Sequence, residues 1–199
     1  VVGGLFASSF FAVALAIVLA QLQPAVRVAE DVEDVLGVPP LAEIPWLSGR
    51  EGTPFAPVSR VIEAPDGQLA EAIRALRVSL LIGRGHGRAT TVMVASGEDG
   101  EGKTTIAASL ARAAAQSGDR VLLIDCDLDR PTVHTIFGGN DRIGIANVLL
   151  DRADSESAIQ LDGVSSGLFM ACGLTGSGDT EIYRSLNWDE LLALLADHL

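Results

Sequence analysis

Residues 96–105 read SGEDGEGKTT, and within them residues 97–104 fit the pattern G-x-x-x-x-G-K-[ST]. The apolar run TTVMVAS (90–96) precedes the pattern and predicts a buried strand, and the alanine-rich stretch TTIAASLARAAAQSGD (104–119) follows it and predicts a helix. In this setting the glycines let successive backbone N–H groups point inward at phosphates, and the helix N-terminus adds the positive end of its dipole. The stretch therefore predicts a nucleotide-binding loop in an α/β fold.

The loop contains Lys103, the only lysine among 199 residues. A compact ammonium suits a phosphate cradle better than the planar fork of arginine, which explains why a chain that otherwise uses arginine has a lysine here. We expect Lys103 to contact the β- and γ-phosphates of ATP and the hydroxyl of Thr104 to bind Mg²⁺. The predicted nucleotide-binding residues are Gly97, Gly100, Glu101, Gly102, Lys103, Thr104 and Thr105.

A second apolar run, VLLID (121–125), predicts a strand that ends in two acids, Asp125 and Asp127. Ligands of open α/β sheets bind at the carboxyl ends of the strands, so both carboxylates are expected to face the loop and its metal. One of them would orient Mg²⁺ or the hydroxyl that accepts the phosphoryl group, and the sequence leaves open which acid does which.

The remaining pattern predicts the fold class, a P-loop NTPase. Residues 167–172 read as a third strand, and residues 68–83 and 188–199 read as amphipathic helices. Strands alternating with helices predict a mostly parallel sheet with helices on both faces. We assign residues 67–199 to this domain.

The first 22 residues carry no charge and differ from the rest. At about 1.5 Å per helical residue they would cross the roughly 30 Å hydrocarbon core of a bilayer, which predicts a transmembrane helix at 1–22. A signal peptide or a buried core helix is the alternative. The proline-rich residues 23–66 are expected to be a juxtamembrane connector, with a short acidic helix, a turn and a short strand at 31–45 and an exposed linker at 48–65.

Composition excludes some functions. A formal net charge of −12 would repel a phosphate backbone, so we expect no nucleic-acid partner. Cys126 and Cys172 form no CxxC pair, which is typical of buried thiols in a reducing compartment and not of a disulfide framework or a metal site.

In content and order these segments resemble the bacterial tyrosine kinases (BY-kinases) that are fused to polysaccharide co-polymerases. The shared features are a transmembrane helix, a proline-rich connector, an E-x-x-R-x-x-R helix, a P-loop ending in GEGKTT, and a modified Walker motif, hhhDxDxxRP, matched by VLLIDCDLDRP (121–131). The segments GIANVL (144–149) and LFMACG (168–173) also have counterparts in that family.

The resemblance implies an ATP- and Mg²⁺-dependent protein tyrosine autokinase that regulates exopolysaccharide or capsule synthesis and export. Its catalytic residues would be Lys103, Asp125 and Asp127, and Thr104, Asp125 and Asp127 would hold the metal. The helix bearing Glu71, Arg74 and Arg77 would contact neighbouring subunits of a homo-oligomer, so that the tyrosine-rich tail of one subunit reaches the site of another. The polysaccharide export machinery would be a further partner. The protein would lie in the bacterial inner (plasma) membrane, with its kinase domain in the cytoplasm.

The sequence departs from the family pattern at three places. Asp129 stands where the family usually has arginine, and GLTGSGDTEIY (173–183) replaces the usual G-x-x-P-x-N-P stretch. The sequence given also stops before the Walker B strand and the tyrosine-rich tail, so the domain is expected to be truncated and its activity alone is left open. NVLLD (147–151) imitates a Walker B strand but comes too early, and Asp151 is interpreted as a solvated acid at a helix end.

Two other functions compete with the kinase. A partition or division ATPase of the deviant Walker type would need a second lysine early in the loop, where this chain has Glu98. A non-catalytic co-polymerase scaffold that only binds ATP is the other alternative, and a phosphorylation assay would separate it from the kinase.

Overall fold

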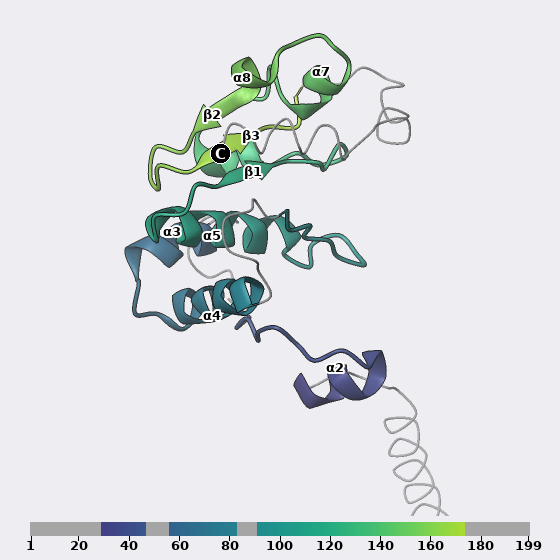
Figure 1. The fold of residues 1–199 in the computed structure, drawn as a ribbon, viewed down its shortest axis with the longest axis vertical. Helices are drawn as coiled ribbons and strands as arrows, with labels where there is room; N and C mark the ends of the chain where they lie inside the picture. The colour runs from purple at the N-terminus through teal and green to yellow at the C-terminus, as the bar shows by residue number, and fades with distance from the viewer. Residues whose placement is uncertain (1–28, 47–55, 83–90, 174–199) are drawn as a thin grey trace, which may run out of the picture. The chain divides into compact units, whose positions relative to one another are not determined.

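The computed structural model describes residues 29–46, 56–82 and 91–173 (Figure 1). The predicted transmembrane helix at 1–22 and the predicted helix at 188–199 lie outside these residues. Within the described ranges, no helix combines the length and the apolar character that a membrane span requires. Contacts divide the chain into two compact units, Val1–Glu43 and Ile44–Leu199, and we describe each by itself.

The first unit contains helix α2 (Ala29–Leu36), which confirms the predicted short acidic helix. The helix ends at Gly37, whose φ of 68° lies in the left-handed region that favours glycine. The N–H of Gly37 donates to the carbonyl of Glu33 at 2.8 Å. Residues 38–46 form no strand, so the short strand expected there is wrong.

The second unit is built on a three-stranded sheet in the order β1-β3-β2. Strand β1 (Leu122–Ile124) pairs in parallel with β3 (Leu168–Met170), and β2 (Ile159–Leu161) pairs antiparallel with β3. The predicted strands at 121–125 and 167–172 are therefore confirmed, and β2 is an addition that the sequence pattern did not indicate. With one parallel and one antiparallel pair, the described sheet is mixed and not mostly parallel as expected.

Helices cover both faces of this sheet, as predicted. On one face Phe169 packs with residues of α3 (Ala56–Glu63), α5 (Lys103–Gln116) and α6 (Val133–Phe137). On the other face Met170 packs with α7 (Ile145–Leu149) and α8 (Ser155–Ala158). Neighbouring residues of β3 thus point to opposite faces, as the pleat of a strand requires.

Helix α5 is central to the second unit and carries Lys103 at its N-terminus. It lies between the sheet and α4 (Gln68–Ile82), against which Ala113 packs beside Leu69 and Ile73 (Figure 1). The helix ends earlier than the predicted residue 119, because Gly118 adopts a φ of 87°. The N–H of Gly118 bonds Ala115 and that of Asp119 bonds Ala114, a Schellman motif.

Two expectations about the second unit are wrong. Residues 56–63 were expected to be exposed linker, yet they form α3, in which Val58 and Val61 are buried in the core. Pro57 is compatible with this helix because it lies in the first turn, where no intrahelical N–H bond is lost.

The second wrong expectation is the buried strand before the P-loop. Residues 91–96 form no strand and are mostly exposed, with Met93 88% accessible. A strand needs a neighbouring strand for its ladder, and β1 pairs with β3 in the described sheet, not with these residues.

Candidate functional site

The P-loop joins residue 96 to α5 through two glycines in the left-handed region. Gly100 and Gly102 have φ values of 82° and 92°, and the N–H of Ile106 donates to the carbonyl of Gly102 at 2.9 Å. The backbone N–H of Glu98 donates to Oε2 of Glu101 at 3.0 Å, which closes the loop on itself. The sequence therefore builds a tight glycine turn directly into the N-terminus of a 14-residue helix, the arrangement that binds phosphates.

Lys103 meets one of the two predicted acids. Its Nζ lies 2.9 Å from Oδ2 of Asp127 and 4.0 Å from Oδ1 of Asp99. The hydrogen bond and the charge of Asp127 raise the pKa of Lys103. Burial alone would raise the pKa of Asp127, but the bonds from Lys103 and from the Arg130 N–H outweigh it and lower the pKa. The site therefore contains an ion pair where the P-loop joins the N-terminus of α5.

Asp125 has a different environment from Asp127. It is only 4% exposed, and its carboxylate accepts three backbone N–H groups. Burial is the largest influence on this group and raises the pKa of Asp125 in spite of these donors. The two acids that the sequence left equivalent are thus distinct: Asp127 contacts Lys103, and Asp125 contacts the backbone.

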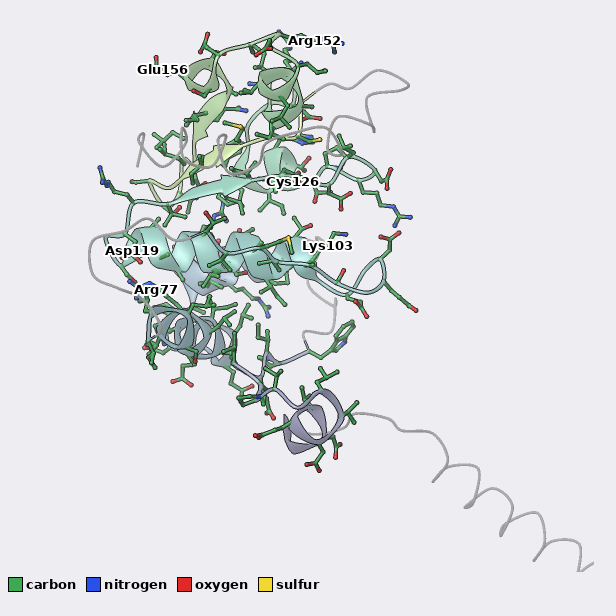
Figure 2. The ribbon with its side chains drawn as sticks, turned by 45° about the vertical axis from the view of Figure 1, so that its right-hand side comes forward. Arg77, Lys103, Asp119, Cys126, Arg152 and Glu156 are labelled. Atoms are coloured by element: carbon green, nitrogen blue, oxygen red, sulfur yellow. The ribbon has the colours of Figure 1, made fainter. Side chains whose placement is uncertain are left out.

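A second ion pair crosses from the loop to the segment after β1. Oδ2 of Asp99 lies 3.1 Å from an Nη2 of Arg130, and both side chains are largely exposed. Asp129, which stands where the resemblance expects arginine, is exposed on the same segment. Figure 2 shows Lys103 at the N-terminal end of α5 and Cys126 on this segment. Sequence reasoning placed this segment opposite the P-loop, but no local pattern indicated that Asp99 and Arg130 would pair across it.

The oxygen donors of the site suit Mg²⁺. Thr104 and Thr105 are half-buried in the first turn of α5, and Asp127 supplies a carboxylate beside Lys103. Magnesium is bound at phosphate sites by one or two such oxygens together with phosphate oxygens and water. The described ranges contain no group of three His, Cys, Asp or Glu side chains that could hold a metal. Thr104 and Asp127 are therefore the residues that would hold Mg²⁺ together with a nucleotide.

The three residues predicted to contact other subunits lie on α4, away from Lys103. The guanidinium of Arg77 forms two bonds to Oδ2 of Asp119, at 2.9 and 2.7 Å, and Figure 2 shows this pair at the far end of α5. Arg74 donates to the carbonyl of Pro65 at 2.6 Å, and Glu71 is exposed. Within the chain, the two arginines hold neighbouring segments together.

A buried ion pair anchors α5 and was missed from the sequence. Nε and Nη2 of Arg112 each lie 3.0 Å from an oxygen of Asp162, and the two side chains are 3% and 0% exposed. The available signal was that Arg112 is the one charged residue of the alanine-rich helix α5 after Lys103, whereas its partner lies 50 positions away.

Comparison with known proteins finds similarity to nucleotide-binding proteins and tyrosine-protein kinases. Residues 92–190 match the family described as CbiA, the CobQ/CobB/MinD/ParA nucleotide binding domain. The chain is 39% identical over 109 residues to the tyrosine-protein kinase YwqD of Bacillus subtilis, which covers 52% of this chain and 46% of that protein. It is 27% identical to the tyrosine-protein kinase etk of Escherichia coli, over all of this chain and 29% of that protein. The chain thus spans under half of each of these two relatives.

Solved structures of related proteins have a similar fold. The kinase domain of the Escherichia coli tyrosine kinase ETK superposes with a TM-score of 0.75 at 26% identity, over 87% of this chain and 70% of that chain. The chimerical protein CapA2B2 superposes with a TM-score of 0.71 at 28% identity, over 84% of this chain and 70% of that one.

Proposed function

Since the chain is a homologue of bacterial tyrosine-protein kinases and carries a P-loop nucleotide-binding domain, we propose that it is part of an ATP-dependent protein tyrosine autokinase that regulates exopolysaccharide or capsule synthesis and export. The observation that carries the proposal is the 2.9 Å contact between Lys103 of the P-loop and Asp127 of the segment after β1. This contact brings a phosphate-binding cation and a partly exposed carboxylate to one point, as phosphoryl transfer to a hydroxyl needs.

In the proposed reaction the N–H groups at the start of α5 and Lys103 bind the phosphates of ATP. The tyrosine oxygen forms a bond to the γ-phosphorus as the bond to the β-phosphate oxygen breaks and ADP leaves. Asp127 orients the tyrosine hydroxyl and accepts its proton, and Lys103 stabilises the charge that collects on the phosphate oxygens. Mg²⁺, when bound by Thr104 and Asp127, would neutralise part of the phosphate charge.

The partners and the location belong to the same proposal. Glu71 is exposed on α4, whereas Arg74 and Arg77 would have to exchange their bonds with the Pro65 carbonyl and with Asp119 for intersubunit ones. A tyrosine-rich tail of a neighbouring subunit would be the substrate, and the polysaccharide export machinery would be a partner. Residues 1–22 would anchor the protein in the bacterial inner membrane, with the P-loop domain in the cytoplasm, where ATP is available.

The test compares Lys103→Met with Arg77→Met in the full-length protein. Lys103→Met keeps most of the apolar stem but removes the ammonium, so it should abolish both ATP binding and phosphotyrosine formation, and Lys103→Arg should also fail because of its planar fork. Arg77→Met, which removes a cation at the other end of α5, should keep ATP binding. Wild-type phosphotyrosine formation in Lys103→Met would refute the kinase mechanism. ATP binding by the native protein without any transfer would instead favour the non-catalytic scaffold.

A further inference from the structure

We infer that Asp125 is a positioning residue, whose buried carboxylate fixes the backbone of residues 127–133 so that Asp127 reaches Lys103. The inference deepens the proposed function and rests on it, because the position of Asp127 matters through the phosphate-binding lysine. It assigns different tasks to two acids that are only two residues apart in the sequence.

The first step is that both oxygens of the Asp125 carboxylate accept hydrogen bonds from the backbone of the following segment. Oδ1 accepts the N–H of Asp127 at 3.1 Å, and Oδ2 accepts the N–H groups of Thr132 and Val133 at 3.0 Å each. These bonds span the segment from its beginning to the first turn of α6. Because backbone N–H groups that are buried must find acceptors, one carboxylate here satisfies three of them.

The second step is the anchoring of Asp125 itself. Its own N–H donates to the carbonyl of Met170 at 2.9 Å, which continues the ladder between β1 and β3 by one residue. Its carboxylate is therefore attached to the sheet, and the segment that follows is attached to that carboxylate. The sheet thus sets the place of the segment through a single side chain.

The third step is the contact that this segment makes with Lys103 through the carboxylate of Asp127. With its N–H held by Asp125, Asp127 directs Oδ1 to the N–H of Arg130 at 3.0 Å and Oδ2 to Nζ of Lys103 at 2.9 Å. Asp127 is only partly buried, so it can contact a ligand, whereas Asp125 is 4% exposed. Asp125 therefore acts on the site through Asp127.

Acylation of Lys103 provides a readout that needs no nucleotide. Because the bond to Asp127 occupies Nζ of Lys103 in the native structure, loss of that bond should let acetic anhydride modify the amine faster, as peptide mass spectrometry at this residue would measure. We expect Asp127→Asn to speed acylation severalfold, and Asp125→Asn to do the same although it does not contact Lys103. Asp119→Asn, which removes an exposed carboxylate at the other end of α5, should leave the rate unchanged.

The double variant decides whether Asp125 acts through Asp127. If it does, Asp125→Asn adds nothing to the acylation rate once Asp127 is already asparagine, because coupled residues are not additive. An unchanged rate in Asp125→Asn alone, or rate factors that multiply in the double variant, would overturn the inference. In addition, Asp125→Asn keeps one acceptor oxygen and should therefore have a smaller effect than Asp125→Ala.

Two further measurements cover the remaining outcomes. Hydrogen exchange of the wild-type protein needs no variant, and fast exchange at the amides of Asp127, Thr132 and Val133 would also overturn the inference. Binding of mant-ADP with MgCl₂ tests the proposed function separately: a wild-type protein that binds none refutes that function, while the acylation pattern still decides the role of Asp125. Where mant-ADP does bind, Asp125→Asn should lower its affinity in the native background and not in the Asp127→Asn background.

Discussion

Replacing Asp162 by asparagine should destabilise the fold more than any exposed charge change in the second unit. The substitution keeps the shape of the side chain but removes the charge that faces Arg112. Both side chains are almost fully buried, and the guanidinium also donates to the carbonyl of Ile136 and lies 4.8 Å from the ring of Phe137. The variant therefore leaves a buried cation without its anion.

The magnitude follows from this burial. Removing one partner of a buried ion pair costs about 3–5 kcal/mol, because the remaining charge stays desolvated. A typical domain is stable by only about 5–15 kcal/mol, so the loss is a large part of the total. At about 2–4 °C per kcal/mol for a chain of this size, the midpoint of thermal unfolding should fall by roughly 6–20 °C.

Urea unfolding followed by far-UV circular dichroism at pH 7 measures this loss. The matched control is Asp119→Asn, which breaks the Arg77–Asp119 pair, whose side chains are 21% and 39% exposed. Exposed pairs contribute about 0.2–1 kcal/mol, so the control should be nearly neutral. The double variant Arg112→Met with Asp162→Asn removes both charges and should be less destabilised than the sum of its single variants.

Two results would refute this reasoning. One is a loss in Asp162→Asn no larger than that of Asp119→Asn, which would mean that the pair is solvated in solution. The other is simple additivity in the double variant, which would mean that Arg112 and Asp162 contribute independently.

Three further predictions follow from the same structure. Burial by itself raises the pKa of Asp162, but the bonds from Arg112 and Ser165 and the Arg112 charge outweigh it and lower the pKa. The ionised carboxylate therefore adds to the free energy of unfolding above the unfolded pKa of about 3.9, and this contribution is lost as the pH falls through the lower folded pKa. In urea titrations from about pH 6 to pH 2, the stability of the wild type should approach that of Asp162→Asn. Gly144→Ala should cost roughly 1–3 kcal/mol in the same assay, because its Cβ would overlap the backbone of Ala171, Cys172 and Gly173, whereas Gly163→Ala, with nothing within 4 Å of its Cβ, should be nearly neutral. The double change of Arg74 and Arg77 to Ala should weaken self-association of the full-length protein roughly 30-fold, as measured by sedimentation, at about 1 kcal/mol for each arginine. Asp119→Ala, which breaks only the intrachain pair, should not weaken it. Unchanged sedimentation of the arginine variant would mean that these residues have an intrachain role alone.

Features of the site that depend on neighbouring residues were predictable from the sequence. The glycines of the loop, the helix that begins at Lys103 and the strands before Asp125 and after Gly167 follow from spacing, apolar runs and backbone preference. The Schellman end of α5 had a signal in Gly118, although the predicted boundary was three residues too long. Residues 56–63 misled the prediction because proline was interpreted as linker, when it also fits the first turn of a helix.

Features that depend on contacts between segments far apart in the sequence could be identified only from the tertiary structure. The apolar run at 91–96 has strand composition, but a strand forms only where a ladder partner is available, and that depends on the arrangement of the sheet. Arg112 and Asp162 are 50 residues apart and Arg77 and Asp119 are 42 apart, so no local pattern links them. The sequence by itself determined that two acids follow β1 beside a phosphate loop. Only the tertiary structure decided that Asp127 meets Lys103 while Asp125 meets the backbone, because the ladder with β3 and the start of α6 fix where each carboxylate lies.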